Sequence, residues 1–339
     1  MAQQDSATQS ATLTADRVDR YAPDQKAVWD EFVRNSKNGS FLFLRDYMDH
    51  MQDRVQDCSL IVRDGDGRVS GLLPGYIEED SYFSHGRLTY GGLVTGRGTR
   101  LSAVLSALDA VATWLVQAGV RTLWYKPVPH IYHRMPADED RYALFLLGAQ
   151  CVRSGMLAVV SLRDEPEYQE RRRRAVKKAQ QNGLTVQVST DYPAYWGILT
   201  ELLRERYGVT PVHSVAEMEH LTALFPNNMK LFACYSGTEM LAGIIVYTSA
   251  RVMRAQYIAS SAAGRKAGAL DLVIDHLIRA GAAAVDYIDL GTSDEQSGRV
   301  LNAGLMDQKE GFGARSVALE QYRVDLTRWQ PGTLTSVLR

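Results

Sequence analysis

The chain has 339 residues, of which 45% are hydrophobic and 23% charged, as is ordinary for a globular protein with a substantial core. Its formal net charge of −1 excludes the global basic field that drives non-specific nucleic-acid binding, so any basic site must be local. The three cysteines form no C-x-x-C or Cys/His cluster, which argues against a disulfide framework and a zinc site. We expect Cys58, Cys151 and Cys234 to be small core residues.

The N-terminal segment is polar and has no apolar run of the signal-peptide kind, so we expect a disordered lead-in over 1–18. The sequence contains no stretch of 18 or more apolar residues, and no membrane span or membrane partner is expected. Together these features predict a cytoplasmic protein.

A first set of elements is predicted between 19 and 160. The letters DQKAVW, Asp24–Trp29, open a short helix pattern, and two apolar runs around Asp64–Gly67 predict a hairpin. The segment SYFSHGRLTYGGLV then predicts a strand. A stripe of apolar residues predicts a helix over 101–118, which Gly119 ends, and RTLWYKPV predicts a buried strand.

The same order returns in the second half of the chain. The letters DYPAYW, Asp191–Trp196, repeat the pattern D-x-x-A-x-W and open a helix. A hairpin is predicted across Ser236–Glu239, then a strand in RVMRAQYIAS, a helix over about 267–280 before Gly281, and a strand in AAVDYIDLGT. The five elements thus occur twice, offset by roughly 160 to 170 residues.

This repetition indicates a duplicated unit, although a coincidence of generic α/β elements is the alternative. A strand–helix–strand step implies a right-handed crossover to a parallel neighbour. Because an antiparallel hairpin precedes that step, each unit is predicted to contain a mixed sheet.

A basic segment, DEPEYQERRRRAVKKAQQNG at 164–183, separates the two sets. Acidic residues near its start and basic residues later suit the dipole of a helix that ends at Gly183. Positions three or four apart share a helix face, so Arg171, Arg174 and Lys178 form a candidate stripe for phosphates of a nucleotide sugar or of a tRNA end. A solvated helix face is the alternative interpretation.

Antiparallel strands that feed a helix and a parallel strand resemble the GNAT acyltransferase fold. Two such units, with the motifs RRRRAVKKAQQNGLTVQV and YIASSAAGRKAGALDLVIDHLIRAGAAAVDYIDLGTS and the K-x-G-F-G at Lys309–Gly313, resemble its FemAB/FemX-like branch. The resemblance implies an α/β (α+β) fold of two tandem GNAT-like units. These are 19–160 and 161–339, and the second includes the connecting basic helix 164–183.

The segments SHGRLTYGG and DLGTSDEQSGRVLNAGL are similar to parts of proteins from surface-polysaccharide and amino-sugar pathways. This likeness implies a sugar N-acyltransferase, which moves an acyl group from acyl-CoA to the amine of a nucleotide-linked amino sugar. FemX-type proteins instead take an aminoacyl group from aminoacyl-tRNA, which makes tRNA the partner in this alternative. A catalytically inactive tandem GNAT binding module is a third interpretation. No metal is expected, and the oligomeric state stays open.

The residues Arg265–Leu270 precede the predicted second-half helix and partly match Q/R-x-x-G-x-G/A, the pattern with which GNAT enzymes cradle the diphosphate of coenzyme A. Arg265 and Gly268 fit this pattern, whereas Leu270 replaces its final small residue, so a plain turn into a helix is the alternative. The resemblance implies a donor site at Tyr257, Ile258, Ser260, Arg265, Lys266, Gly268 and Ala269.

N-acyl transfer needs a base for the proton of the attacking amine and hydrogen-bond donors for the developing oxyanion. His85 is the first candidate base, with Asp289 and Glu310 as alternatives, although a lone histidine in a strand is more often structural. Backbone N–H groups near Tyr257–Ser260 are the expected oxyanion donors. The sequence contains no G-x-S-x-G, Walker A, G-x-G-x-x-G or H-E-x-x-H motif, which removes the serine hydrolase, P-loop and zincin classes and weakens dinucleotide binding.

The remaining candidates lie in loops and strand ends where ligand clefts often form. In the loop 125–140, His130 and His133 are spaced as metal ligands can be, but no third ligand is evident. The candidate substrate residues are Tyr90, His130, Tyr132, Arg174, Lys178, Thr292, Ser293, Asn302 and Lys309.

Overall fold

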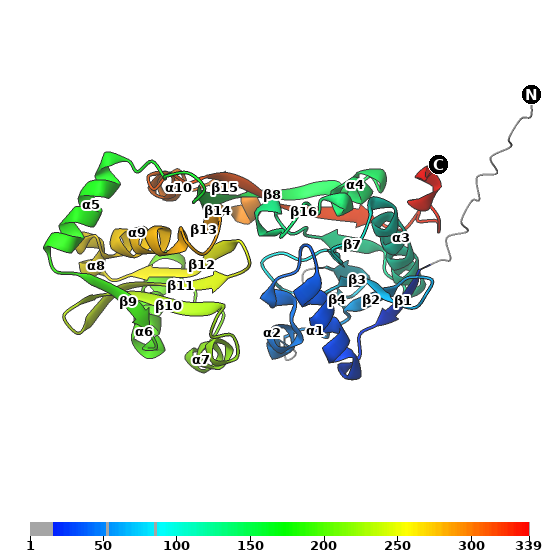
Figure 1. The fold of residues 1–339 in the computed structure, drawn as a ribbon, viewed down its shortest axis with the longest axis horizontal. Coiled ribbons are helices and arrows are strands. Elements are labelled where there is room, and N and C mark those ends of the chain that lie inside the picture. The colour runs from blue at the N-terminus through cyan, green and yellow to red at the C-terminus, as the bar shows by residue number, and fades with distance from the viewer. Residues whose placement is uncertain (1–15, 52–53, 85–86, 339) are drawn as a thin grey trace, which may run out of the picture.

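The computed structural model describes residues 16–51, 54–84 and 87–338, and shows two α/β units side by side (Figure 1). Most of the predicted lead-in over 1–18 lies outside these residues. The strand β1 (Arg17–Arg20) nevertheless begins within it, which corrects the predicted start of the fold.

The first unit contains the predicted helix, hairpin, strand, helix and strand in the predicted order. Its elements are β1, α1 (Lys26–Asn35), α2 (Arg45–Met48), β2 (Leu60–Arg63), β3 (Val69–Leu73), β4 (Tyr76–Glu78), β5 (Ser81–Phe83), β6 (Val94–Thr95), α3 (Leu101–Gln117), β7 (Thr122–Tyr125), α4 (Glu139–Leu146) and β8 (Gln150–Ser161). The hairpin β2–β3 and the helix α3 are confirmed. The strand predicted in SYFSHGRLTYGGLV is limited to the short β5 and β6, among the residues described there.

The second unit repeats this order after the predicted basic helix. Its elements are α5 (Glu170–Gln181), β9 (Thr185–Ser189), α6 (Tyr192–Tyr207), α7 (Val215–Leu224), β10 (Met229–Ser236), β11 (Glu239–Thr248), β12 (Val252–Ser260), α8 (Ala262–Ala267), α9 (Ala269–Gly281), β13 (Tyr287–Thr292), β14 (Asp294–Glu295), β15 (Val300–Leu301), α10 (Ala303–Glu310) and β16 (Arg315–Asp325). Figure 1 shows α9 on one side of the strands and α6 and α7 on the other.

A single large sheet crosses both units, in addition to a four-stranded sheet β1-β2-β3-β6 in the first. The order of the large sheet is β4-β5-β7-β16-β8-β13-β12-β11-β10-β9. Its continuity depends on β8 and β16, which pair with each other and run between the units (Figure 1). Because β16 also pairs with β7, the end of the chain returns to the sheet of the first unit, so the boundary between 160 and 161 does not separate two closed sheets.

Two local features confirm that the units are equivalent. In each, the crossover brings two strands together in parallel over three residue pairs, β5 with β7 and β12 with β13. In each, the tryptophan of D-x-x-A-x-W is buried and its indole N–H donates to a backbone carbonyl. Trp29 donates to Phe43 over 2.7 Å, and Trp196 donates to His213 over 3.1 Å.

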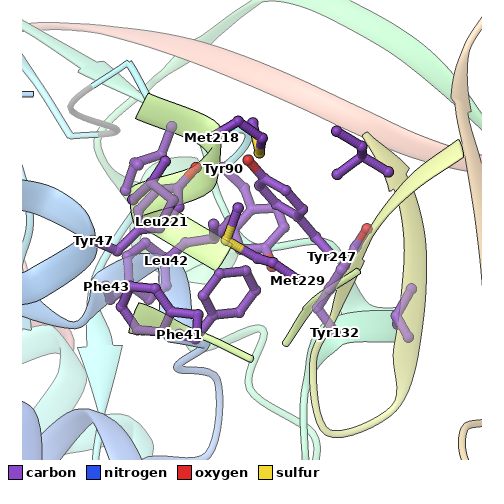
Figure 2. Close-up of a cluster of buried hydrophobic side chains, with 14 of the residues drawn as sticks. Phe41, Leu42, Phe43, Tyr47, Tyr90, Tyr132, Met218, Leu221, Met229 and Tyr247 are labelled. Carbon is purple, nitrogen blue, oxygen red and sulfur yellow. The ribbon is translucent and has the colours of Figure 1, made fainter. Parts of the chain in front are cut away.

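An aromatic core joins the two units (Figure 2). Phe41, in a 3₁₀ turn after α1, has its ring centroid 5.5 Å from that of Phe225 and 5.6 Å from that of Tyr247 in the second unit. Tyr47 contacts the same two rings. Burial of such large side chains between the halves fixes their relative position, since each aromatic ring removes much apolar surface from water.

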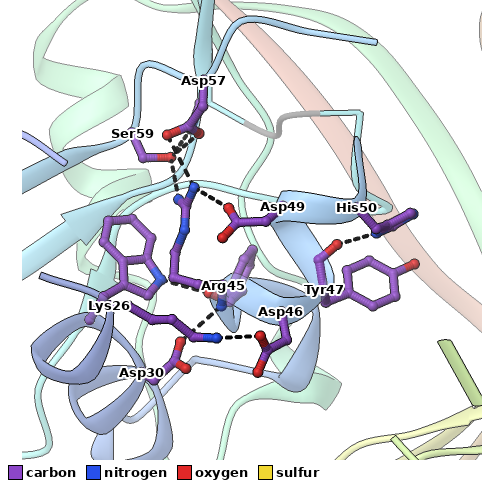
Figure 3. Close-up of polar contacts among 12 residues, drawn as sticks. Lys26, Asp30, Arg45, Asp46, Tyr47, Asp49, His50, Asp57 and Ser59 are labelled. Atoms are coloured by element: carbon purple, nitrogen blue, oxygen red, sulfur yellow. Dashed lines mark hydrogen bonds and ion pairs between the residues drawn. The ribbon is translucent and has the colours of Figure 1, made fainter. Parts of the chain in front are cut away.

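A fully buried arginine, Arg45 in α2, organises the first unit (Figure 3). Its guanidinium lies 2.5 Å from Asp49 and 3.3 Å from Asp57, and its carbon Cζ lies 3.8 Å from the ring centroid of Tyr21. The α2 backbone is held by Asp30 of α1, which accepts a 2.8 Å hydrogen bond from the Arg45 N–H. The charge is thus paired on several sides, as a buried charge requires.

Cys58 and Cys234 are buried as predicted, whereas Cys151 on β8 is exposed, which corrects its assignment to the core. Within the described ranges, no helix has the length and apolar character needed to cross a membrane.

Candidate active site

The strands β12 and β13 separate after a short parallel contact. They pair only from Val252–Arg254 to Tyr287–Asp289. On its other edge β13 pairs with β8 from Tyr287 onward, and this pairing continues to Thr292 after an irregularity that follows Asp289. The edge of β12 that faces β13 therefore has no strand partner after Arg254 among the described residues, and its backbone groups face a gap in the sheet.

A cleft of about 550 Å³ occupies this gap, a volume typical of ligand pockets. It is lined from both faces of the sheet, because α6 contributes Leu202 and Leu203 and α9 contributes Leu270 and Ile274. The other lining residues are Arg172, Arg206, Arg254, Ala255, Gln256, Ile258, Ala259, Ser260, Gly264, Arg265, Asp271, Leu290, Gly291, Thr292, Leu305, Gln308 and Lys309.

Asp289 holds the bend that opens the gap. Its carboxylate, fully buried, accepts a 2.7 Å hydrogen bond from the N–H of Gly291 and a 2.6 Å bond from the hydroxyl of Tyr132, and it pairs with Arg254. Gly291 has a φ of +76°, a conformation that side chains other than glycine rarely adopt. Since three donors already occupy this carboxylate, it is poorly placed to act as a general base.

The charges in this network stabilise one another. Burial acts to lower the pKa of Arg254, but Asp289 and Tyr132 together outweigh it and the pKa is raised. Burial and the same carboxylate raise the pKa of the Tyr132 phenol well above its ordinary value. Both groups therefore keep their protons at neutral pH. The ring of Tyr90 lies 4.6 Å from that of Tyr132 and supports it from the first unit.

A β-bulge in β12 faces the cleft. Ile245 of β11 pairs with Tyr257 and Val246 pairs with Ala255, so Gln256 is an extra residue in the strand. A bulge redirects neighbouring backbone groups and side chains away from the regular ladder. Gln256 accordingly lines the cleft, directly beside the unpaired edge of β12.

Lys309 forms part of the wall on the β13 side. Its ammonium group is buried and donates to the carbonyl oxygens of Gly291 at 3.0 Å and Thr292 at 2.6 Å. Burial lowers the pKa of this amine from 10.5 to about 8. An ammonium group has three donors, so one N–H remains for a ligand in the cleft.

The start of α9 differs from an open diphosphate cradle. Arg265 and Lys266 belong to the helix α8, so the predicted loop is corrected to a helix that Gly268 joins to α9. The helix α5 covers this junction, because a Cβ built on Gly268 would lie only 2.7 Å from the carbonyl oxygen of Ala175.

The first turn of α9 also carries its own carboxylate. Asp271 lies there, and one of its oxygens is 2.5 Å from Nη1 of Arg172 in α5. A negative side chain at a helix start interacts with the dipole as a phosphate would. The residues present therefore do not fit the diphosphate of coenzyme A at this helix start.

The cleft is cationic: among the residues that the structure describes, its lining contains five basic residues and one acidic residue, Asp271. Such an excess favours a ligand that carries negative charge.

The structure brings together five of the predicted site residues in the lining of the cleft. These are Ile258, Ser260, Arg265, Thr292 and Lys309. Asp289, Tyr132 and Tyr90 form the network behind the lining, as described above. His85 lies outside the described residues.

The other predicted residues do not line the cleft, and several have clear structural tasks. Lys178 donates to the carbonyl oxygen of Lys266 and so tethers α5 to α8. Asn302 caps α10, where its side chain accepts from the N–H of Leu305. Arg174 is exposed near Glu170. The rest of this set is Tyr257, Lys266, Gly268, Ala269, Ser293, Glu310 and His130, the last of which is exposed.

Sequence reasoning missed Arg172, Arg254 and Gln256. The stripe predicted on the basic helix was Arg171, Arg174 and Lys178, but Arg172 is the residue of this helix that reaches the cleft. The signal for Arg254 and Gln256 was two polar residues within an otherwise apolar strand, which a ligand-facing strand end explains.

Comparison with known proteins identifies the fold. Residues 167–297 match the family described as Acetyltransferase (GNAT) domain. The crystal structure of FemX is 14% identical with a TM-score of 0.65, over 95% of this chain and 99% of FemX. L-PGS from Bacillus licheniformis is 12% identical with a TM-score of 0.59, over 94% and 96%. A tandem GNAT protein from the clavulanic acid biosynthesis pathway is 10% identical with a TM-score of 0.50, over 93% and 100%.

No curated protein gave a significant match. At these identities the structural likeness shows the fold alone, and the expected link to sugar N-acyltransferases gains no support from it. The chain therefore has the fold of tandem GNAT proteins over nearly its whole length, with the GNAT domain match in its second unit.

Proposed function

We propose that the protein is an N-acyltransferase that binds its donor in the cleft between β12 and β13. The observation that carries this proposal is the unpaired edge of β12 after Arg254, which faces a cationic cleft. Backbone N–H groups on such an edge are fixed donors for a carbonyl oxygen that becomes negative during the reaction. The free N–H of Lys309 faces the same space from the opposite wall.

We favour aminoacyl-tRNA as the donor, as the FemX-like resemblance implies. The start of α9 is covered by α5 and already holds the carboxylate of Asp271, which would repel a diphosphate. The basic residues Arg172, Arg206 and Arg265 instead offer contacts to the phosphates of a tRNA end. The acyl carrier in this case is a ribose ester.

In this reaction the neutral amine of the acceptor attacks the acyl carbonyl carbon. A C–N bond forms, the C–O bond to the ribose breaks, and the proton released by the amine ends on the ribose oxygen. The chain's contribution is to orient the ester and to stabilise the oxyanion, since Asp289 is occupied by three donors and Glu310 does not line the cleft. Asp289 acts as a positioning residue.

A second candidate is acyl-CoA-dependent acylation of a nucleotide-linked amino sugar. The apolar lining residues Leu202 and Leu203 of α6 and Leu270 and Ile274 of α9 favour it, because a thioester arm can pack against such side chains. A catalytically inactive binding module is the non-enzymatic alternative.

The test presents both donors to the purified full chain. Aminoacyl-tRNA carrying labelled amino acids, or acyl-CoA, is mixed with a panel of amines that includes nucleotide-linked amino sugars. Amide products are followed by mass spectrometry, and thiol release is followed for acyl-CoA. We expect transfer of label from tRNA to an amine, and its loss in Arg254→Gln. Thiol release without tRNA turnover would favour the second candidate, and no turnover with either donor would favour the binding module.

A further inference from the structure

Three polar residues on neighbouring strands of the large sheet, Lys126, Gln321 and Arg153, form one row across the sheet at the junction of the units. We call this row the polar rung. Gln321 of β16 pairs with Arg153 of β8. On the other side, Tyr125 of β7 pairs with Tyr322, so the next residue, Lys126, lies beside Gln321. Residues on one rung point to the same face of a sheet. Leu319, two residues before Gln321, belongs to the core that joins the units, and the rung points to that face.

The ammonium group of Lys126 has no counter-charge bonded to it. It forms no hydrogen bond or ion pair with any residue that the structure describes. Burial lowers its pKa to about 8, and the strongest charges acting on it are the cations Arg153 and Arg254. Asp294 acts in the opposite direction; its Oδ2 is bound to Arg153 over 2.8 Å, and its Oδ1 is buried without a partner among the described residues.

The guanidinium of Arg153 is also incompletely bonded. Its Nε is buried and has no hydrogen-bond partner among the described residues. Leaving a buried donor of a charged group unpaired costs free energy, which a bound anion would recover. Two neighbouring cations with unused donors and an amide between them match the needs of a carboxylate or phosphate.

This rung lies next to the donor cleft. Arg254 lines the cleft and is at the same time close enough to influence Lys126. A molecule anchored on the rung would therefore extend toward the unpaired edge of β12, on the face covered by the first unit.

We propose that Lys126, Gln321 and Arg153 form an oxyanion subsite that binds a carboxylate or phosphate of the acceptor. Its assignment to the acceptor rests on the proposed function, whereas the subsite itself does not. The acceptor is then an amine that also carries an anionic group, and the cationic rung selects against plain alkylamines.

The binding test uses inorganic phosphate and acetate as separate probes. Lysines of the full chain are reductively methylated with ¹³C, which retains their charge, and the Lys126 signal is identified from Lys126→Arg. We expect that signal to shift saturably with at least one of the anions. The anion that binds shows whether the subsite prefers a phosphate or a carboxylate. Exposed Lys230 of β10 is the control. Arg153→Gln should weaken binding about tenfold or more, as expected for a lost charged hydrogen bond.

Because Arg153→Gln leaves Asp294 unpaired, Gln321→Leu provides a second variant that keeps both charges, and it should also weaken binding. Saturation unchanged in both variants, or shifts of Lys126 and Lys230 that are equally linear in anion concentration, would overturn the subsite. This outcome is independent of turnover.

Where transfer is detected, Lys126→Met should raise KM for the acceptor without changing KM for the donor. An equal rise for both would overturn its assignment to the acceptor.

Discussion

The hydroxyl of Tyr132 in the first unit donates a 2.6 Å hydrogen bond to the carboxylate of Asp289 in the second. Asp289 in turn holds Gly291 in the bend that separates β13 from β12. The first unit therefore reaches the residue that shapes the cleft of the second, which explains how an apparently separate domain contributes to one site.

Tyr132→Phe removes this single contact and leaves the ring in place. A buried hydrogen bond to a charged group contributes about 1.5 to 3 kcal/mol, so we expect the free energy of unfolding to fall by that amount. The rate of transfer should fall as well, because the bend at Gly291 is less firmly held. Urea denaturation and steady-state kinetics measure the two effects. Tyr142→Phe, at an exposed tyrosine of α4, is the matched control and should change neither.

Asp271→Asn tests why the start of α9 does not fit a diphosphate. The change removes the negative charge from the first turn while keeping the size of the side chain, and it frees Arg172. If this carboxylate excludes coenzyme A, the variant should gain affinity for it. A thermal-shift titration with coenzyme A measures this, since a ligand at a hundredfold excess over Kd stabilises by about 2.7 kcal/mol.

The control for this experiment is Asp307→Asn, because Asp307 of α10 pairs with Arg171 on the same basic helix but outside the cleft. Equal coenzyme A binding by wild type and Asp271→Asn would contradict the exclusion and strengthen the case for an acyl-CoA donor.

Element order could be predicted from the sequence because hydrophobic period and turn residues act locally. The two copies of D-x-x-A-x-W, the hairpins and the helix α3 all follow from such signals. The single continuous sheet could not be predicted, since the pairing of β16 with β7 joins segments almost 200 residues apart.

The site was predictable in part for the same reason. Thr292, the last residue of β13, and Lys309, in α10, were both predicted. The choice of Arg172 over Arg174 instead depends on which face of α5 packs on α9. Asp289 was predicted as an alternative candidate base, but two of its three donors, Tyr132 and Arg254, come from distant segments. Such tertiary partners determine whether a carboxylate can act as a general base or instead holds structural hydrogen bonds, and local sequence does not specify them.

From the lowered pKa of Lys309 we predict that transfer depends on pH. Its pKa is lowered from 10.5 to about 8, so the cation that faces the cleft is lost as the pH rises through about 8. If the ammonium assists transfer, kcat/KM should fall above this pH. Deprotonation of the acceptor amine would instead raise kcat/KM with pH. A fall in kcat/KM above about pH 8 therefore points to Lys309. Lys309→Arg should move the decline to higher pH, because a guanidinium stays charged.

The same group affects stability in a defined window. Between about pH 8 and 10.5 the unfolded chain retains a proton that the folded chain has released, so the Lys309 contribution to the free energy of unfolding rises with pH. Chemical denaturation of wild type and Lys309→Met across this range isolates the contribution. A difference between the two that does not vary with pH would argue against the lowered pKa.

Arg45→Met tests whether the first unit depends on its buried cation. The substitution keeps much of the volume but leaves Asp49 and Asp57 without their shared partner and removes the contact with the ring of Tyr21. Removing one partner of a buried ion pair typically costs about 3 to 5 kcal/mol. We expect a loss near the lower bound, since both aspartates are partly accessible to water. Equilibrium denaturation measures it against Arg68→Met, whose side chain is 79% exposed and which should be neutral. Equal stability of the two variants would mean that the aspartates are solvated well enough without the arginine.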